Sequence, residues 1–302
     1  MLCTKCGSNQ TIKYGIRTNK GGEDSQRYFC NSCSSEFSIK LSTAKAVSSV
    51  RRAIITPDKH FPYEDKPAIN ALVKAISLVK PSIYVDLGDV GEWESVSAWK
   101  YKRKQRPPLE HIIPDIEAEI RKVNAGMDII DEALDDVGCD ERHFCEGNHD
   151  NWLNRFVERY PYLPQYRVKT ALSLTDRGYE YHPFGKFLKI GKIHFYHGHQ
   201  YGGMYHTANH LRKLGCNVMY GHWHDIQQMT ATHMDGPKAA WSIGCLKDMS
   251  TESNAWLDNR RINWAHAFAI IDFYGEGDFT VDIVQIIDGK CSIWGNMIDG
   301  NE

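Results

Sequence analysis

The chain has 302 residues, of which 42% are hydrophobic and 25% charged, and its formal net charge is −2. This composition is that of a folded globular protein and excludes a disordered or fibrous chain. No run of about 18 apolar residues occurs, so no membrane-spanning helix is predicted. The amino terminus lacks the apolar stretch of a signal peptide, and we therefore expect a cytoplasmic protein, in the host cytoplasm if it is encoded by a phage.

Charge is distributed unevenly along the chain. Residues 1–52 contain nine Lys or Arg and three Asp or Glu, a balance of +6, whereas the remainder carries −8. A basic segment attached to an acidic body suggests that the segment meets a polyanion.

Four of the nine cysteines form two Cys-x-x-Cys pairs, Cys3 with Cys6 and Cys30 with Cys33. This spacing is typical of a tetrahedral zinc site, and a unit of about 40 residues needs such a cross-link because its core is small. We predict a zinc-binding unit with short strands over residues 1–40, followed by a linker over residues 41–50. The other five cysteines are predicted to be reduced thiols in or near the core.

The amino-terminal unit resembles the zinc ribbons of insertion-sequence transposase proteins, through Cys-x-x-Cys-Gly-Ser at 3–8, Lys-Tyr-Gly at 13–15 and Gln-Arg-Tyr-Phe-Cys at 26–30. Those ribbons bind DNA, so the resemblance implies a nucleic-acid partner, DNA rather than RNA. Tyr14 and Tyr28 are expected either to stack on bases or to pack the small core. Zinc ribbons also dock proteins, and that alternative stays open. The cations expected to contact phosphate are Lys13, Arg17, Lys20 and Arg27.

Beyond residue 50, apolar strand-like runs alternate with helical patterns. Helices are predicted at 66–80, at about 116–137 and near 205–214. Strands are predicted at 51–56, 83–87, 142–145, 187–190, 192–196, 217–220, 225–232, 266–274 and 279–287. Alternation early in the chain and strands alone later predict an α/β fold, as a mixed sheet or as two packed sheets with outer helices.

Five polar clusters each follow one of these strand-like runs. They are Asp-Lys-His at 58–60, Gly-Asp-Val-Gly-Glu at 88–92, Gly-Asn-His-Asp at 147–150, His-Gly-His at 197–199 and Gly-His-Trp-His at 221–224. Each alone is weak evidence, because a Gly-Asp after a strand is usually only a turn. Together they place Asp, Asn and His, which suit Mn²⁺, Fe or Zn²⁺, at strand ends that can share one cleft.

In this order the clusters resemble the calcineurin-like metallophosphoesterase superfamily, including its phage-type members, over residues 51–302. The resemblance implies a four-layer α/β/β/α sandwich with two metal ions at the ends of its central strands. The implied ligands are Asp58, His60 and His224 for the first ion, Asp89 as the bridge, and Asn148, His197 and His222 for the second.

The same resemblance implies that His149 is the acid/base or phosphate-stabilising residue. Asp150 is expected to orient its ring and fix its tautomer. We place His197 rather than His199 at the metal because His197 follows its strand directly, which leaves His199 either as a phosphate contact or as a residue that supports a ligand. Glu92 is expected either to support a ligand or to be a solvated turn residue.

Basic and aromatic residues interleave after the second cluster, with Trp93, Trp99 and Tyr101 among the cations of residues 100–106. This mixture suits the charge and stacking that a single-stranded nucleic acid needs. A solvated basic helix whose Trp side chains pack on the core is an equal alternative. With His199, the candidate substrate contacts are Lys100, Arg103 and Arg155.

These patterns predict a metal-dependent nuclease or phosphodiesterase that hydrolyses nucleic acid. It would use two divalent ions, Mn²⁺ or alternatively Fe or Zn²⁺, and one structural zinc. The first alternative is a phosphatase or phosphodiesterase for a small phosphate ester, a cyclic nucleotide or a phosphoprotein. The second is a non-enzymatic, metal-stabilised scaffold, against which the titratable His149 argues.

Overall fold

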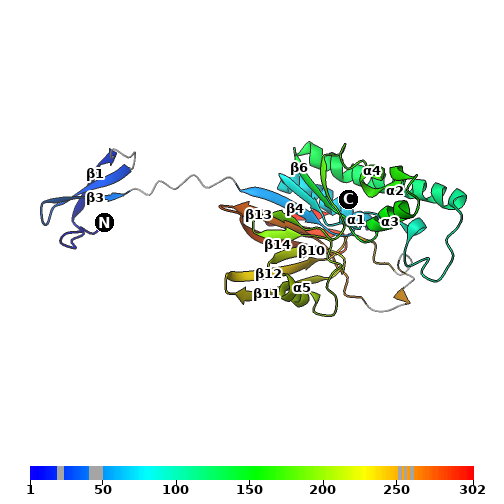
Figure 1. The fold of residues 1–302 in the computed structure, drawn as a ribbon. Helices are drawn as coiled ribbons and strands as arrows, with labels where there is room; N and C mark the ends of the chain where they lie inside the picture. Colours follow the sequence, from blue (N-terminus) through cyan, green and yellow to red (C-terminus); the bar gives the residue numbers. More distant parts are fainter. Residues whose placement is uncertain (19–23, 41–49, 251–253, 255–256, 259–261) are drawn as a thin grey trace. The chain divides into compact units, whose positions relative to one another are not determined.

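A computed structural model describes residues 1–18, 24–40, 50–250, 254, 257, 258 and 262–302. The chain divides into two compact units, Met1–Ser49 and Val50–Glu302, which are taken separately below (Figure 1). Of the predicted linker over residues 41–50, only Val50 lies within the described residues.

The amino-terminal unit is a three-stranded antiparallel sheet in the order β1-β2-β3. The strands are β1 (Thr11–Thr18), β2 (Asp24–Cys30) and β3 (Ser35–Lys40). Its core is small: Cys3, Cys30 and Phe37 are buried, and the ring of Tyr28 stacks on Phe37 with centroids 5.4 Å apart. Tyr28 therefore packs this core, which decides between the two roles expected for it.

The larger unit is built on a six-stranded sheet in the order β14-β13-β4-β5-β6-β7. Its parallel strands are β4 (Arg51–Thr56), β5 (Ile83–Asp86), β6 (Glu141–Cys145) and β7 (Tyr179–His182). β13 (His266–Tyr274) runs antiparallel to β4 and pairs with β14 (Asp278–Ile286). Residues 53–56 of β4 and all of β5 are buried, and their middle positions are apolar, because both of their faces are covered.

A second, five-stranded sheet has the order β11-β12-β10-β9-β8. Its strands are β8 (Leu188–Ile190), β9 (Ile193–Phe195), β10 (Asn217–Tyr220), β11 (Ile226–His233) and β12 (Gly236–Ile243). β9, β10 and β12 are parallel to one another. A hairpin of β15 (Lys290–Ile293) and β16 (Asn296–Asp299) follows near the carboxyl terminus.

Helices cover the outer faces of the two sheets. α1 (Lys66–Val79), α2 (Leu109–Asp136), α3 (Asp150–Arg159) and α4 (Val168–Ala171) lie over the six-stranded sheet, and α5 (His206–Leu214) lies over the five-stranded sheet (Figure 1). One apolar core fills the space between the first sheet and its helices, a second separates the two sheets, and a third lies under α5. The order of layers is therefore α/β/β/α, as predicted.

Capping residues mark the ends of α1, and the bounds of α2 differ from the prediction. α1 starts where the Asp65 carboxylate accepts the backbone N–H of Ala68 at 2.8 Å, and it ends at Lys80 in the left-handed conformation. α2 begins at Leu109, ahead of the predicted start near Ile116, and contains Pro114 in its second turn.

Strands β3, β7, β12, β15 and β16 were not predicted. β7, for example, reads Tyr-Glu-Tyr-His and has no apolar run.

Candidate metal centre

The five polar clusters lie at the carboxyl ends of five strands. β4, β5 and β6 are neighbours in one sheet and end in the loops that carry Asp58, Asp89 and Asn148. β9 and β10 are neighbours in the other sheet and end at His197 and His222. Because the two sheets pack face to face, these loops meet at one end of the sandwich.

The first group of ligand atoms comes from Asp58, His60 and His224. His224 Nε2 lies 3.5 Å from Asp58 Oδ1 and 3.2 Å from His60 Nε2. Atoms that bind one ion at about 2.1 Å lie roughly 3.0–3.4 Å from one another. The three side chains are therefore spaced as ligands of a single ion.

The second group surrounds His197. Its Nε2 lies 3.2 Å from Asp89 Oδ2, 2.9 Å from Asn148 Oδ1 and 3.1 Å from His222 Nδ1. These are again the separations of atoms that share one ion. All seven predicted ligands thus belong to one group or the other.

Asp89 connects the two groups. Its Oδ2 atom faces His197 and also lies 3.9 Å from His60 Nε2 in the first group. Its Oδ1 atom accepts the backbone N–H of His149 at 2.7 Å. One carboxylate is therefore placed to bridge two ions while the main chain holds its other oxygen.

A hydrogen bond on His197 and an ion-pair contact on His60 orient these two rings toward the centre. His197 Nδ1 lies 2.9 Å from the backbone carbonyl of Leu87, and His60 Nδ1 lies 2.7 Å from a carboxylate oxygen of Glu92. In the tautomer with the proton on Nδ1, each Nε2 presents a lone pair to the centre. Burial lowers the pKa of His60 to about 4, which keeps the ring neutral and able to bind metal near pH 7.

The buried carboxylates of Asp58 and Asp89 place negative charge at the centre. Asp58 and Asp89 are 0% and 2% exposed, and across the described ranges no Lys or Arg nitrogen lies within 4.0 Å of either. Burial opposes protonation of His197, yet the carboxylates of Asp89 and Asp58 raise its pKa to about 9. The same pair of buried carboxylates would attract a divalent ion, and the donor set fits ions of the Mn²⁺, Fe or Zn²⁺ type.

The backbone is strained where it presents the ligands. His60, Asp89, His222 and His224 have φ values of 54°, 48°, 66° and 61°, in the left-handed region that non-glycine residues rarely adopt. Such strain persists at functional sites when the surroundings enforce it. The chain also approaches closely here: a Cβ at Gly147 would collide with Asp89, and one at Gly221 would collide with the Asp58 carboxylate.

His149 stands beside the centre, but its predicted partner is different. Its Nδ1 lies 2.9 Å from the backbone carbonyl of Glu92, and its ring packs on Trp152 with centroids 3.9 Å apart. The expectation that Asp150 orients this ring is wrong. The buried Asp150 carboxylate instead accepts the Trp93 indole N–H at 2.9 Å and the Gly147 backbone N–H at 3.1 Å, so it ties the second and third loops together.

Glu92 has a larger part than predicted. Besides facing His60, its carboxylate accepts from Lys247 Nζ at 2.8 Å and lies 3.9 Å from His149 Nδ1. Burial alone would raise the pKa of Glu92, but His60, His149 and Lys247 lower it, so the group stays ionised. Lys247 is only 3% exposed and was not singled out from the sequence, because nothing in its local pattern marks it.

The proposed substrate contacts occupy different places. His199 stacks on Phe184 with centroids 3.9 Å apart and belongs to neither ligand group. Lys100 Nζ pairs with Glu94 at 2.8 Å, while Arg103 and Arg155 are exposed. Residues 97–107 contain a turn and a bend and not the basic helix of the alternative interpretation. In agreement with that alternative, Trp93 packs in the core, whereas Trp99 is 68% exposed.

Arg155 lines a cavity of about 190 Å³. The lining residues are Val96, Ala98, Arg106, Trp152, Arg155, Phe156 and Arg159. Within the described part of the chain, no ion pair involves any of the three arginines, and Arg106 Nη1 is buried without a hydrogen-bond partner. Trp152 is one of the lining residues and also packs on the His149 ring, so a single side chain separates this positively charged pocket from His149.

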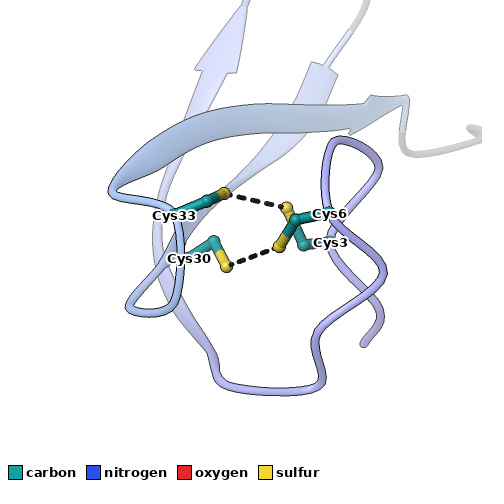
Figure 2. A group of neighbouring side chains, drawn as sticks. All are labelled: Cys3, Cys6, Cys30 and Cys33. Atoms are coloured by element: carbon teal, nitrogen blue, oxygen red, sulfur yellow. Dashed lines mark hydrogen bonds between the residues drawn. The ribbon is translucent and has the colours of Figure 1, made fainter.

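The four amino-terminal cysteines converge on one point (Figure 2). Cys3 Sγ lies 3.7 Å from Cys33 Sγ, and Cys6 Sγ lies 3.6 Å from Cys30 Sγ. Four thiolates about 2.3 Å from one zinc ion are roughly 3.7 Å apart, whereas a disulfide joins its sulfurs at about 2.05 Å. The spacing therefore fits a single zinc ion.

The cations of this unit differ in their availability. Lys13 and Arg17 are exposed. Arg27 pairs with Glu36 at 2.7 Å and lies over the Tyr14 ring at 4.7 Å, which leaves it less free to contact phosphate than expected. Lys20 lies outside the described residues.

Comparisons with known proteins connect the chain to bacteriophages. It is 25% identical to the Gene 54 protein of Mycobacterium phage L5 over 264 residues, which cover 82% of this chain and 98% of that protein. The Gene 54 protein of Mycobacterium phage D29 is also 25% identical, over 263 residues and with the same coverage. No family model matches.

One crystal structure aligns with 77% of this chain and 98% of its own, at 10% identity and a TM-score of 0.36, a likeness too distant to identify a fold. No described helix has the length and apolar character required to cross a membrane.

Proposed function

We propose that the chain is a two-metal phosphoesterase that hydrolyses phosphodiester bonds in nucleic acid. The observation that carries this proposal is the position of Asp89, whose carboxylate faces both ligand groups at 3.2 and 3.9 Å. Residues placed in this way would hold a pair of divalent ions, which suit hydrolysis of a phosphate ester.

Metal ions bound here would supply hydroxide near neutral pH and neutralise charge on the reacting phosphate. The side chains of this protein would bind the ions and position a proton donor. Asp58, Asp89 and the histidines would hold the ions in a buried setting, and the Glu92 carbonyl fixes His149 Nδ1, so that the Nε2 atom is available. A protonated His149 can then donate to the leaving oxygen or to a phosphate oxygen in the transition state.

The arginine cavity favours an extended polyanion as the substrate. Arg106, Arg155 and Arg159 surround it without a carboxylate partner among the described residues, and it shares the Trp152 wall with His149. A phosphate next to the scissile one would be neutralised there, which a small ester with one phosphate cannot exploit. The cysteine-rich unit, with Lys13 and Arg17 exposed, would supply further contacts to the strand.

A substrate panel with Mn²⁺ tests this proposal. It contains single-stranded DNA, duplex DNA, RNA, cyclic nucleotides, bis(p-nitrophenyl) phosphate and p-nitrophenyl phosphate. We expect hydrolysis of the diesters, with kcat/KM greatest for a nucleic acid, and its loss in EDTA. Faster turnover of a monoester or cyclic nucleotide would support the small-substrate alternative, and inactivity on all six would support a scaffold.

A further inference from the structure

A third group of potential ligands lies away from the metal centre, on strands β6 and β7. It comprises His143, Glu180 and His182. His143 pairs with Glu180, and Cys145 pairs with His182, across these parallel strands. Paired residues and residues two apart share one face of a sheet, so all three side chains project from the same face at the sheet edge.

The three side chains meet at the distances of metal ligands. His143 Nδ1 lies 3.1 Å from His182 Nε2 and 3.4 Å from Glu180 Oε2, while the other Glu180 oxygen lies 3.9 Å from His182 Nε2. Ligands about 2.1 Å from one ion are roughly 3.0–3.4 Å apart. A small shift of the Glu180 side chain, which is 67% exposed, would complete the set.

A supporting carboxylate fixes the tautomer of His143. Its Nε2 lies 3.2 Å from Glu141 Oε1, and Glu141 is itself paired with Arg51. The proton of His143 therefore sits on Nε2, and Nδ1 directs a lone pair toward His182. A carboxylate behind a ligating histidine is a common feature of zinc sites, where it orients the ring and increases its basicity.

The local charge also favours a cation. Arg51 balances Glu141, but over the ranges that the structure describes no Lys or Arg nitrogen lies within 4.0 Å of the Glu180 carboxylate. Two imidazoles and one carboxylate are a donor set for Zn²⁺ or a similar transition ion, in preference to Mg²⁺ or Ca²⁺, which prefer oxygen.

We propose that His143, Glu180 and His182 bind one zinc-type ion that joins β7 to β6, with Glu141 as the supporting carboxylate. β7 is a four-residue strand at the edge of its sheet, and a metal bond would secure it. This site is separate from the Asp89 centre and does not depend on the proposed phosphoesterase activity.

Zinc content per chain tests the proposal. The full chain and its variants are stripped with EDTA, reloaded with Zn²⁺, desalted and subjected to elemental analysis. We expect His143→Ala and His182→Ala to hold about one zinc ion fewer than wild type. The matched control is His111→Ala, which removes a 70% exposed imidazole on α2 and should leave the content unchanged. Equal zinc content in His182→Ala and His111→Ala would overturn the proposal.

Glu180→Gln preserves the size of the side chain, so it distinguishes loss of a metal ligand from a folding defect. We titrate each variant with a chromophoric chelator and record the chelator concentration that removes the most weakly bound zinc ion. We expect this concentration to be about 10–100-fold lower for Glu180→Gln than for wild type, and Glu141→Gln to behave similarly. Unchanged release from both would contradict the site. Hydrolysis of bis(p-nitrophenyl) phosphate with Mn²⁺ should be the same in all these variants. If wild type also fails to hydrolyse it, the proposed function is at fault and not this site.

Discussion

The backbone N–H of His149 donates to Asp89 Oδ1 at 2.7 Å, so the residue proposed for acid/base chemistry is connected to the bridging carboxylate through its main chain. Its side chain makes a separate contact with the Glu92 carbonyl. The ring can therefore be removed without disturbing the carboxylate, and the two roles can be tested apart.

Replacing His149 by Ala should lower kcat for bis(p-nitrophenyl) phosphate by about 10²–10⁴-fold, the range for loss of a general acid. Manganese content should remain that of wild type, because the backbone N–H to Asp89 is kept. Elemental analysis and steady-state kinetics measure the two effects, with His111→Ala as the matched control. Unchanged hydrolysis would show that His149 has no catalytic part.

The arginine cavity predicts an effect confined to long substrates. Arg155→Gln and Arg159→Gln should each raise KM for an oligonucleotide severalfold and reduce the slope of log affinity against log salt by about 0.7–0.9. Hydrolysis of bis(p-nitrophenyl) phosphate should not change. Arg121→Gln, an exposed arginine of α2 that does not line the cavity, is the control. An equal effect on both substrates would place these arginines elsewhere in the mechanism.

Removal of residues 1–45 tests the cysteine-rich unit. We expect DNA binding to weaken and to depend less on salt, since the exposed Lys13 and Arg17 are lost. Cleavage of bis(p-nitrophenyl) phosphate should persist, because residues 50–302 form a compact unit of their own. Fluorescence anisotropy with labelled DNA gives the affinity. Equal affinity in the shortened chain would favour the protein-docking alternative.

A buried ion pair beside the site predicts a large effect on stability. Lys59 Nζ lies 2.8 Å from Asp86 Oδ2, and both side chains are nearly inaccessible, at 1% and 2% exposure. Asp86→Ala leaves the ammonium group buried alone and should reduce the free energy of unfolding by about 3–5 kcal/mol. Urea denaturation measures this.

The matched control is the exposed pair of Lys192 and Asp278, in which Asp278→Ala should change stability little. A loss in Asp86→Ala no greater than in that control would contradict the prediction.

The local order of the chain explains what could be predicted. Asp58, Asp89 and Asn148 directly follow apolar strands, and the ends of neighbouring parallel strands meet at one sheet edge, so their convergence is predictable from sequence. The four-layer order followed from the resemblance and agrees with the positions of the three apolar cores.

The remaining contacts depend on the paths of loops. The sequence cannot show that the 88–92 loop brings the backbone carbonyl of Glu92 to the His149 ring, because Asp150 is the next residue in the chain whereas Glu92 is 57 residues away. Lys247 reaches its place from a segment without a recognisable pattern. β7 is short and polar, so the group of His143 and His182 was not foreseen either.

The central claim is that Asp89 bridges two ions, and Asp89→Asn tests it most directly. Manganese content and hydrolysis of bis(p-nitrophenyl) phosphate are measured on the same samples of wild type and variant. We predict about two manganese ions in wild type, a loss of at least one in the variant, and hydrolysis reduced to background. A variant that retained the manganese content and the activity of wild type would contradict the account.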